Sequence, residues 1–205
     1  MISASEALER LREGNHRFVS DQCSGSQHAD QRRRRELASG QEPFATILGC
    51  SDSRVPAEII FDQGLGDLFV IRVAGNIIAP SLVGSVEFAA ARFGTPLVVV
   101  LGHTQCGAIA ATVEELTHKG ESPSPNLLSI VNRVRPSVLP LMNTELRHDL
   151  PSLMREAVRA NIRMSANHLR HGSELMENLI EQKGFRVVGA EYCLDTGVVD
   201  FFDMD

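Results

Sequence analysis

The sequence predicts an α/β fold in which helices flank a mainly parallel central sheet and a helical arm precedes the sheet at the N-terminus. Three short, nearly all-apolar runs carry this prediction, because strands buried on both faces of a parallel sheet have this composition. They are residues 44–49 (FATILG), 67–73 (DLFVIRV) and 96–103 (PLVVVLGH). Helical patterns after the second and third runs require crossover connections, which join parallel strands. We expect the strand order 2-1-3-4, followed by an antiparallel edge strand at the C-terminus.

The chain of 205 residues is expected to form a single domain, with residues 1–40 as the helical arm and 41–205 as the α/β core. Apolar residues recur at helical spacing over 4–20, and a second helix is expected over 29–38. Both helices precede the first predicted strand, so neither can be a crossover that connects two strands. We therefore expect these helices to form an arm, one that could embrace a second subunit.

The remaining elements follow from periodicity and from residues typical of helix ends. The segment 81–94 has Ser81 as a candidate N-cap and Gly94 as a helix stop. Further helices are expected over 106–120, 126–142 and 151–183, the last of them interrupted at 171–173. The chain closes with two predicted strands, 185–194 and 197–202, joined by a turn at 195–197.

The charge pattern argues against a nucleic-acid partner. The formal net charge is −6, and the one basic block, residues 32–35, continues helically and is typical of a solvated helix face. No apolar segment is long enough to span a membrane, and the N-terminal residues lack the apolar stretch of a signal peptide. We therefore expect a cytoplasmic protein that binds neither nucleic acid nor membrane.

A candidate metal site lies at the ends of two predicted strands. Cys50 and His103 each follow a strand that ends in Leu-Gly, and the carboxyl ends of neighbouring parallel strands are where α/β folds bind ligands. Cys106 follows His103 by three residues. Two thiolates and an imidazole suit a tetrahedral Zn²⁺ with its fourth position open, as in catalytic sites. The alternative is that the three are buried core residues.

Asp52 and Arg54 follow the first candidate ligand closely and suggest a catalytic role. An ionised carboxylate beside the metal can accept the hydrogen of a metal-bound water and so direct its lone pair at a substrate. An arginine that binds the carboxylate through two hydrogen bonds would keep it ionised and prevent it from becoming the fourth ligand. The alternative is an ion pair that only stabilises a turn.

The motifs CSDSRVP (50–56) and HTQCG (103–107) together closely resemble those of the bacterial type of β-class carbonic anhydrases. The resemblance implies one Zn²⁺ per chain, bound by Cys50, His103 and Cys106, with Asp52 and Arg54 as the pair beside the metal. It also implies a homodimer or homotetramer with active sites at the subunit interface. The implied reaction is the reversible hydration of CO₂ to bicarbonate and a proton by zinc-bound hydroxide.

The same resemblance implies a small substrate pocket. Gln41 stands nine residues before Cys50, where its amide would contact CO₂ or bicarbonate. Phe69, Ala74 and a partner-subunit Phe88 would form the apolar wall. Two other functions stay open at this point: hydrolysis of carbon disulfide or carbonyl sulfide on the same fold, and a non-catalytic zinc-binding module. The remaining cysteines, Cys23 and Cys193, are expected to be free thiols.

Overall fold

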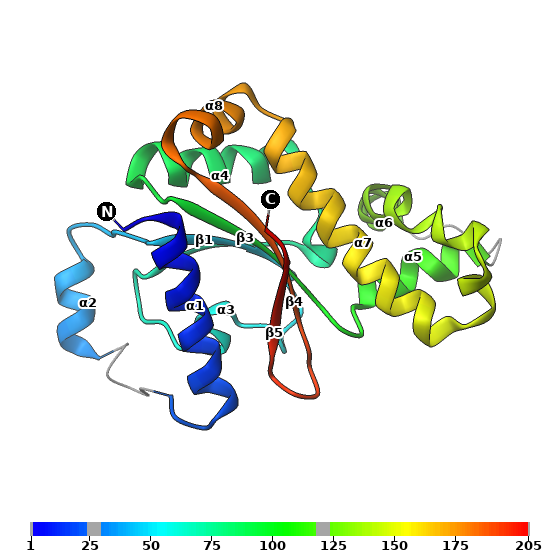
Figure 1. The fold of residues 1–205 in the computed structure, drawn as a ribbon, viewed down its shortest axis with the longest axis horizontal. Helices are drawn as coiled ribbons and strands as arrows, with labels where there is room; N and C mark the ends of the chain where they lie inside the picture. Colours follow the sequence, from blue (N-terminus) through cyan, green and yellow to red (C-terminus); the bar gives the residue numbers. More distant parts are fainter. Residues whose placement is uncertain (1, 24–29, 118–123, 205) are drawn as a thin grey trace.

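The computed structural model describes residues 2–23, 30–117 and 124–204 (Figure 1). Over these residues the chain forms one five-stranded sheet with the order β2-β1-β3-β4-β5. The strands are β1 (Ala45–Gly49), β2 (Leu68–Arg72), β3 (Leu97–His103), β4 (Arg186–Tyr192) and β5 (Val199–Asp203). The first four are parallel, and β5 pairs antiparallel with β4. The predicted fold class is therefore confirmed.

The central strands are apolar because both of their faces are covered. Every residue of β1 and β3 is buried, and successive side chains point to opposite faces. Leu48 thus belongs to a core that the sheet shares with five helices, whereas Ile47 belongs to a second core on the other face. The continuous apolar runs of the sequence correspond to this double burial.

Helices cover both faces of the sheet. On one face lie α4 (Pro80–Phe93), α7 (Leu150–His171) and α8 (Glu174–Lys183), with α5 (Gly107–Thr117) and α6 (Pro125–Val138) packed against α7. On the other face lie α1 (Ala4–Val19) and the short α3 (Ala57–Ile60). Figure 1 shows α4 and α8 on one side of the strands and α1 and α3 on the other. None of the helices in the described part of the chain is both long and apolar enough to cross a membrane.

The N-terminal segment has two parts of different character. α1 packs on the sheet of its own chain, with Ala7 and Leu11 fully buried, because α3 alone is too short to cover this face. Asn15 fixes this packing: its amide donates to the carbonyl oxygens of Ile60 and Gly197. By contrast α2 (Gln31–Leu37), which the structure describes completely, contains no buried residue. The contact of this segment with a second subunit stays a prediction.

Several element boundaries differ from the sequence expectations. The helix predicted from Ser81 begins at Pro80 with Ala79 as its N-cap, because proline at the first helical position already has a helical φ. The helix predicted to reach 142 ends at Val138, and two 3₁₀ turns follow, Leu141–Asn143 and Glu145–His148. The predicted interruption at 171–173 is confirmed, since α7 ends before Gly172 and Ser173 caps α8. The predicted start at 29 and the stretch 118–120 lie outside the described residues.

Candidate metal centre

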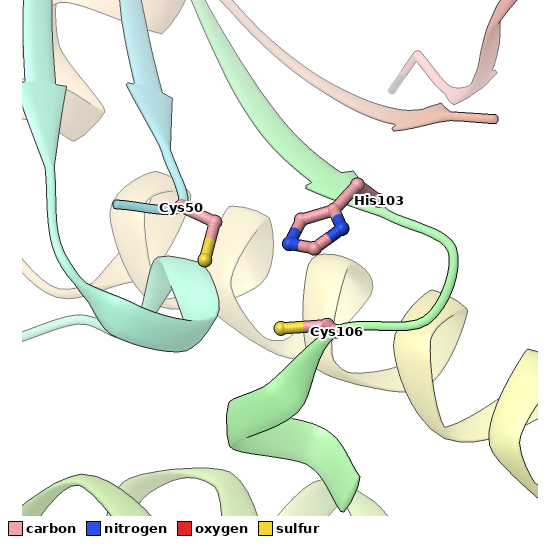
Figure 2. A group of neighbouring side chains, drawn as sticks. All are labelled: Cys50, His103 and Cys106. Carbon is pink, nitrogen blue, oxygen red and sulfur yellow. The ribbon is translucent and has the colours of Figure 1, made fainter. Parts of the chain in front are cut away.

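Three potential ligands converge at the carboxyl ends of β1 and β3, which are neighbours in the sheet. Cys50 directly follows β1, His103 is the last residue of β3, and Cys106 directly precedes α5 (Figure 2). Their ligand atoms all lie within 4.8 Å of one another. Only 5%, 0% and 1% of these residues, respectively, are exposed. Gln105, with a φ of 57°, makes the left-handed turn that brings Cys106 back toward His103.

The orientation of His103 leaves one ring nitrogen facing the two sulfurs. Its Nδ1 lies 2.8 Å from the carbonyl oxygen of Thr104, and since a carbonyl can only accept, Nδ1 carries the hydrogen. Thr104 is itself fixed, because its hydroxyl accepts a hydrogen bond from the amide of Leu194. Nε2 is one of three buried side-chain polar atoms without a partner among the described residues. A metal ion at the cluster would satisfy this nitrogen.

The two cysteines of the cluster shift each other's pKa in opposite directions. The hydrogen bond from the Cys106 thiol, above all, lowers the pKa of Cys50 below its usual range. The same contact, together with burial, raises the pKa of Cys106. Burial by itself would lower the pKa of His103, but the contact with Cys50 and the Thr104 carbonyl outweigh it and raise that pKa. Two buried thiols and an unpaired imidazole nitrogen form a donor set that fits Zn²⁺.

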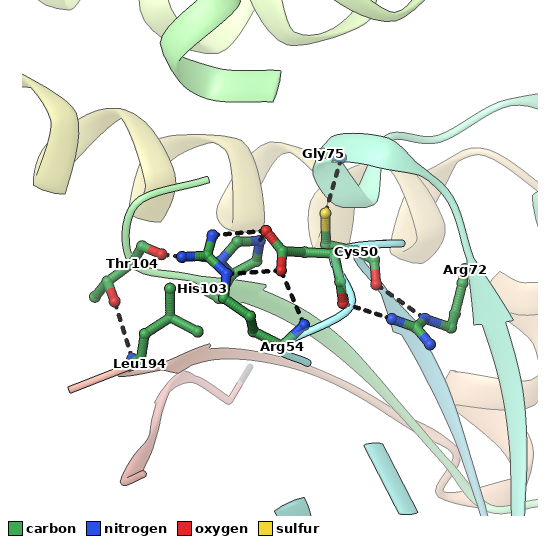
Figure 3. Close-up of polar contacts among 8 residues, drawn as sticks. Cys50, Arg54, Arg72, Gly75, His103, Thr104 and Leu194 are labelled. Atoms are coloured by element: carbon green, nitrogen blue, oxygen red, sulfur yellow. Dashed lines mark hydrogen bonds and ion pairs between the residues drawn. The ribbon is translucent and has the colours of Figure 1, made fainter. Parts of the chain in front are cut away.

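The carboxylate of Asp52 lies at the edge of the cluster and is held by Arg54. The guanidinium binds both carboxylate oxygens, Nε to Oδ1 at 2.9 Å and Nη2 to Oδ2 at 2.8 Å (Figure 3). Asp52 Oδ2 lies 3.8 Å from Nε2 of His103. The hydrogen bonds from the Arg54 side chain, first of all, hold the pKa of Asp52 well below its usual range. The predicted Asp52–Arg54 pair is therefore present, beside the candidate ligands.

Two further groups support this loop, and the sequence did not reveal either of them. Arg72, the last residue of β2, donates to the carbonyl oxygens of Cys50 and Asp52 at 3.0 and 2.7 Å (Figure 3). The backbone amide of Gly75 donates to Cys50 Sγ at 3.4 Å. The glycine in the Ala-Gly-Asn triplet after β2 was the available signal for a special backbone geometry.

The residues expected to contact substrate do not gather at this cluster within one chain. Phe69 pairs with Thr46 in the register of β2 and β1, roughly 13 Å along the strand from Cys50. Phe69 packs instead against Phe88, with ring centroids 6.3 Å apart, and Phe88 is 55% exposed. Gln41 is exposed in the segment before β1, beyond the same amino end of the strand.

Ala74 differs from the other three expected pocket residues. It opens the 3₁₀ turn Ala74–Asn76 that follows β2. The next residue in this turn is Gly75, whose amide contacts Cys50. Ala74 therefore lies at the carboxyl end of the sheet, on the same side as the candidate ligands.

Comparison with known proteins agrees with this geometry. The sequence model of the carbonic anhydrase family matches residues 45–199. Carbonic anhydrase 2 of Mycobacterium tuberculosis is 41% identical over 193 residues, which cover 93% of this chain and 89% of the relative. A carbonic anhydrase of Mycolicibacterium smegmatis is 49% identical over 134 residues, 65% of this chain and 64% of the relative.

Solved structures give the same result at the level of the fold. The β-carbonic anhydrase CafA of Aspergillus fumigatus superposes with a TM-score of 0.74 at 25% identity, covering 97% of this chain and 90% of that one. A tetrameric β-carbonic anhydrase of Sordaria macrospora reaches the same TM-score of 0.74 at 22% identity, covering 96% and 97%. This chain therefore belongs to the β-carbonic anhydrases, a family of lyases whose general activity is the hydration of CO₂.

Proposed function

We propose that this protein is a zinc-dependent carbonate dehydratase that converts CO₂ reversibly to bicarbonate and a proton. The observation that carries the proposal is the convergence of Cys50, His103 and Cys106 on one point, with the Asp52 carboxylate beside them. These three ligands would hold one Zn²⁺ per chain and leave a fourth position open. When bound, the ion supplies the Lewis acidity that makes water nucleophilic near neutral pH.

Asp52 and Arg54 would orient the attacking water. The ionised carboxylate would accept a hydrogen bond from that water and so direct its oxygen lone pair toward CO₂. Arg54 binds both carboxylate oxygens, which keeps Asp52 ionised and turned away from the ligand position. A closed structural zinc site would have no use for such a pair, so this geometry favours catalysis over a non-catalytic zinc-binding module.

The substrate pocket would be completed by a second subunit. Gln41, Phe69 and Phe88 lie at the amino end of the sheet, far from the ligands of their own chain. Phe88 is 55% exposed, as expected for an aromatic residue that contacts another chain. In a homodimer, or a homotetramer built from such dimers, these residues of one subunit would face the metal of the other. Ala74 would supply the wall from the same chain as the metal.

The choice of substrate is tested by two assays on one zinc-loaded preparation. We expect rapid CO₂ hydration in a stopped-flow pH-indicator assay and no release of sulfide from carbon disulfide. Sulfide release without CO₂ hydration would instead assign the site to carbon disulfide or carbonyl sulfide. Inactivity in both assays, with zinc fully bound, would support the non-catalytic module.

The shared pocket is tested by mixing two inactive variants. Gln41→Ala damages the amino end, and Cys106→Ser damages the carboxyl end. In a mixed dimer one site combines the two intact ends, so random pairing of equal amounts should restore about a quarter of the sites. No recovery after unfolding and refolding the variants together, with mixed dimers demonstrated by a tag, would contradict a pocket shared between subunits.

A further inference from the structure

Two polar side chains interrupt the otherwise apolar buried face of α7. Asn161 and Ser165 are 2% and 5% exposed, and their spacing of four residues places them on one side of the helix. The other buried residues of α7, a helix that the structure describes in full, are Leu153, Ala157, Val158, Ile162, Ala166 and Leu169. Buried polar groups destabilise a fold unless they find hydrogen-bond partners, so the partners of these two are informative.

Both side chains bind the backbone of one turn. Asn161 Nδ2 donates to the carbonyl oxygen of Gly75 at 2.8 Å, and Ser165 Oγ donates to that of Asn76 at 3.0 Å. The turn has an unusual backbone, because Gly75 and Asn76 have φ values of 72° and 41°. Glycine adopts this geometry freely, and asparagine adopts it at a smaller cost than most residues, so contacts that hold the turn stabilise it. Asn161 and Ser165 are the α7 side chains that bind the turn in this geometry.

The turn is confined on its other side by α5. A Cβ atom built on Gly75 would lie 3.0 Å from Cβ of Ala108, which belongs to the first turn of α5. Ala108 lies two residues after the candidate ligand Cys106. The turn is thus held between the helix that begins at one ligand and the helix that carries Asn161.

The distance between α7 and the sheet is also fixed. A Cβ atom on Gly102 would lie 2.6 Å from Cδ1 of Ile162, and one on Gly189 would lie 2.9 Å from Cγ2 of the same residue. Glycine at both positions therefore lets Ile162 contact the backbone of β3 and β4. Because Asn161 precedes Ile162, this close approach determines the distance between its amide and the turn.

The geometry points to Asn161 and Ser165 as positioning residues for the metal ligand Cys50. By fixing the carbonyls of the turn, they aim the amide of Gly75 at Cys50 Sγ, 3.4 Å away (Figure 3). An N–H donor draws electron density from a thiolate, so it weakens the donation of charge to a bound metal and stabilises the buried thiolate. Hydrogen bonds around the ligands tune a metal site in this way. This inference rests on the proposed metal site.

The test replaces zinc with Co²⁺ and measures the wavelength of the sulfur-to-cobalt charge-transfer band. The band is measured in the unmodified protein, in Asn161→Ala, in Ser165→Ala and in the double variant. Loss of the aimed amide should move the band to longer wavelength, because electrons on the sulfur become easier to transfer. Competition with a chelator should show zinc affinity lowered by about tenfold to a hundredfold in the double variant, because the buried thiolate is less stabilised against protonation and less well positioned, and these losses outweigh the stronger donation from sulfur. Ser165→Ala deletes a single oxygen and should give a smaller change in the same direction, which keeps the test usable if Asn161→Ala does not fold.

Two matched controls separate positioning from general destabilisation. Asn15→Ala removes a buried asparagine that also binds backbone carbonyls, but on the opposite face of the sheet. Ser137→Ala removes a buried hydroxyl that donates within its own helix, to the carbonyl of Val134. Both should lower stability and leave the cobalt band unchanged.

An unshifted band and unchanged zinc affinity in the folded double variant would overturn the inference and leave the metal site intact. Absence of any sulfur-to-cobalt band in the unmodified protein would overturn the proposed metal site itself. The two failures are therefore distinguishable.

Discussion

The two ends of the central sheet differ in how complete they are within one chain. At the carboxyl end, Cys50, His103 and Cys106 are at most 5% exposed, and Asp52 already has its arginine partner. At the amino end, Gln41 is exposed and Phe88 has 55% of its surface in contact with solvent. The difference teaches that one subunit contains the whole cluster of candidate metal ligands. Three of the four residues proposed to contact CO₂, namely Gln41, Phe69 and Phe88, lie at the opposite end of the sheet, where we propose that a second subunit uses them.

Removal of a ligand at the carboxyl end should have the largest effect. Cys106→Ser replaces a thiolate with a hydroxyl, a much poorer zinc ligand, and leaves two protein ligands. We expect zinc to be lost on gel filtration and CO₂ hydration to fall to the uncatalysed rate, measured by elemental analysis and stopped-flow assay. Cys193→Ser is the matched control and should keep its zinc and its CO₂ hydration activity. Full zinc retention by Cys106→Ser would contradict the assigned ligand set.

Changes to the Asp52–Arg54 pair should reduce turnover and spare the metal. Asp52→Asn keeps the shape of the side chain but removes the charged hydrogen-bond acceptor, and we expect the loss of this orienting group to lower the hydration rate by about 10²–10⁴-fold. Arg54→Ala should nearly abolish hydration as well, because the released carboxylate is free to occupy the open metal position. Zinc content and hydration rate of both variants are the measurements. Unchanged hydration in Asp52→Asn would leave the pair with a structural role only.

Loss of one aromatic wall residue at the amino end should have a moderate effect. Phe88→Ala removes an aromatic wall, and such contacts contribute about 0.5–1.5 kcal/mol, which corresponds to a loss in kcat/KM of up to about tenfold. Zinc content should not change. Leu127→Ala, an equally exposed apolar residue on α6, is the control and should retain full activity. Unchanged kcat/KM in Phe88→Ala would mean that the pocket is not built from this end of the sheet.

The parts of the fold that the sequence predicted well are those with one strong local cause. β1 and β3 are buried on both faces, so their apolar runs were unambiguous. The break between α7 and α8 follows from Gly172 and from the capping side chain of Ser173. The sequence did not reveal α3, because four residues are too few to show a helical period. The prediction of Ser81 as the N-cap of α4 was wrong, because Pro80 already has a helical φ and begins the helix.

The candidate site shows the same division between local and distant causes. The spacing of His103 and Cys106 and the position of Cys50 are local, and the structure brings the three together. The contacts of Asn161 and Ser165 join segments almost ninety residues apart, and no local pattern predicts such a pairing. The available signal was weaker: two polar residues, four apart, at positions where the amphipathic pattern of α7 calls for apolar ones.

The smallest effect should appear in the pH dependence of stability at the carboxyl end. Hydrogen bonds from Arg54, first of all, depress the pKa of Asp52 in the folded protein. A depressed pKa means that the pair stabilises the fold at pH values above the unfolded aspartate pKa, about 3.9, and that this stabilisation is lost as the pH falls through the folded value. In Arg54→Ala the pKa of Asp52 in the folded protein should approach its value in the unfolded chain. The contribution of Asp52 to the pH dependence of stability should then largely disappear.

Urea unfolding of the metal-free protein across a pH series measures this contribution. Cys50 and His103 also titrate in the metal-free protein, but they are present in all the variants, so the comparison between variants isolates the Asp52–Arg54 pair. The unmodified protein should lose more stability than Arg54→Ala below about pH 4, and the two curves should run parallel above about pH 5. Arg133→Ala removes a cation that donates to the backbone oxygen of Ser129, and its curve should follow that of the unmodified protein throughout. The effect should be modest, because the Arg54 side chain is 52% exposed and water screens its charge. Parallel curves for all three proteins down to the acid limit would mean that the Asp52–Arg54 pair, although bidentate, orients the carboxylate without stabilising the fold.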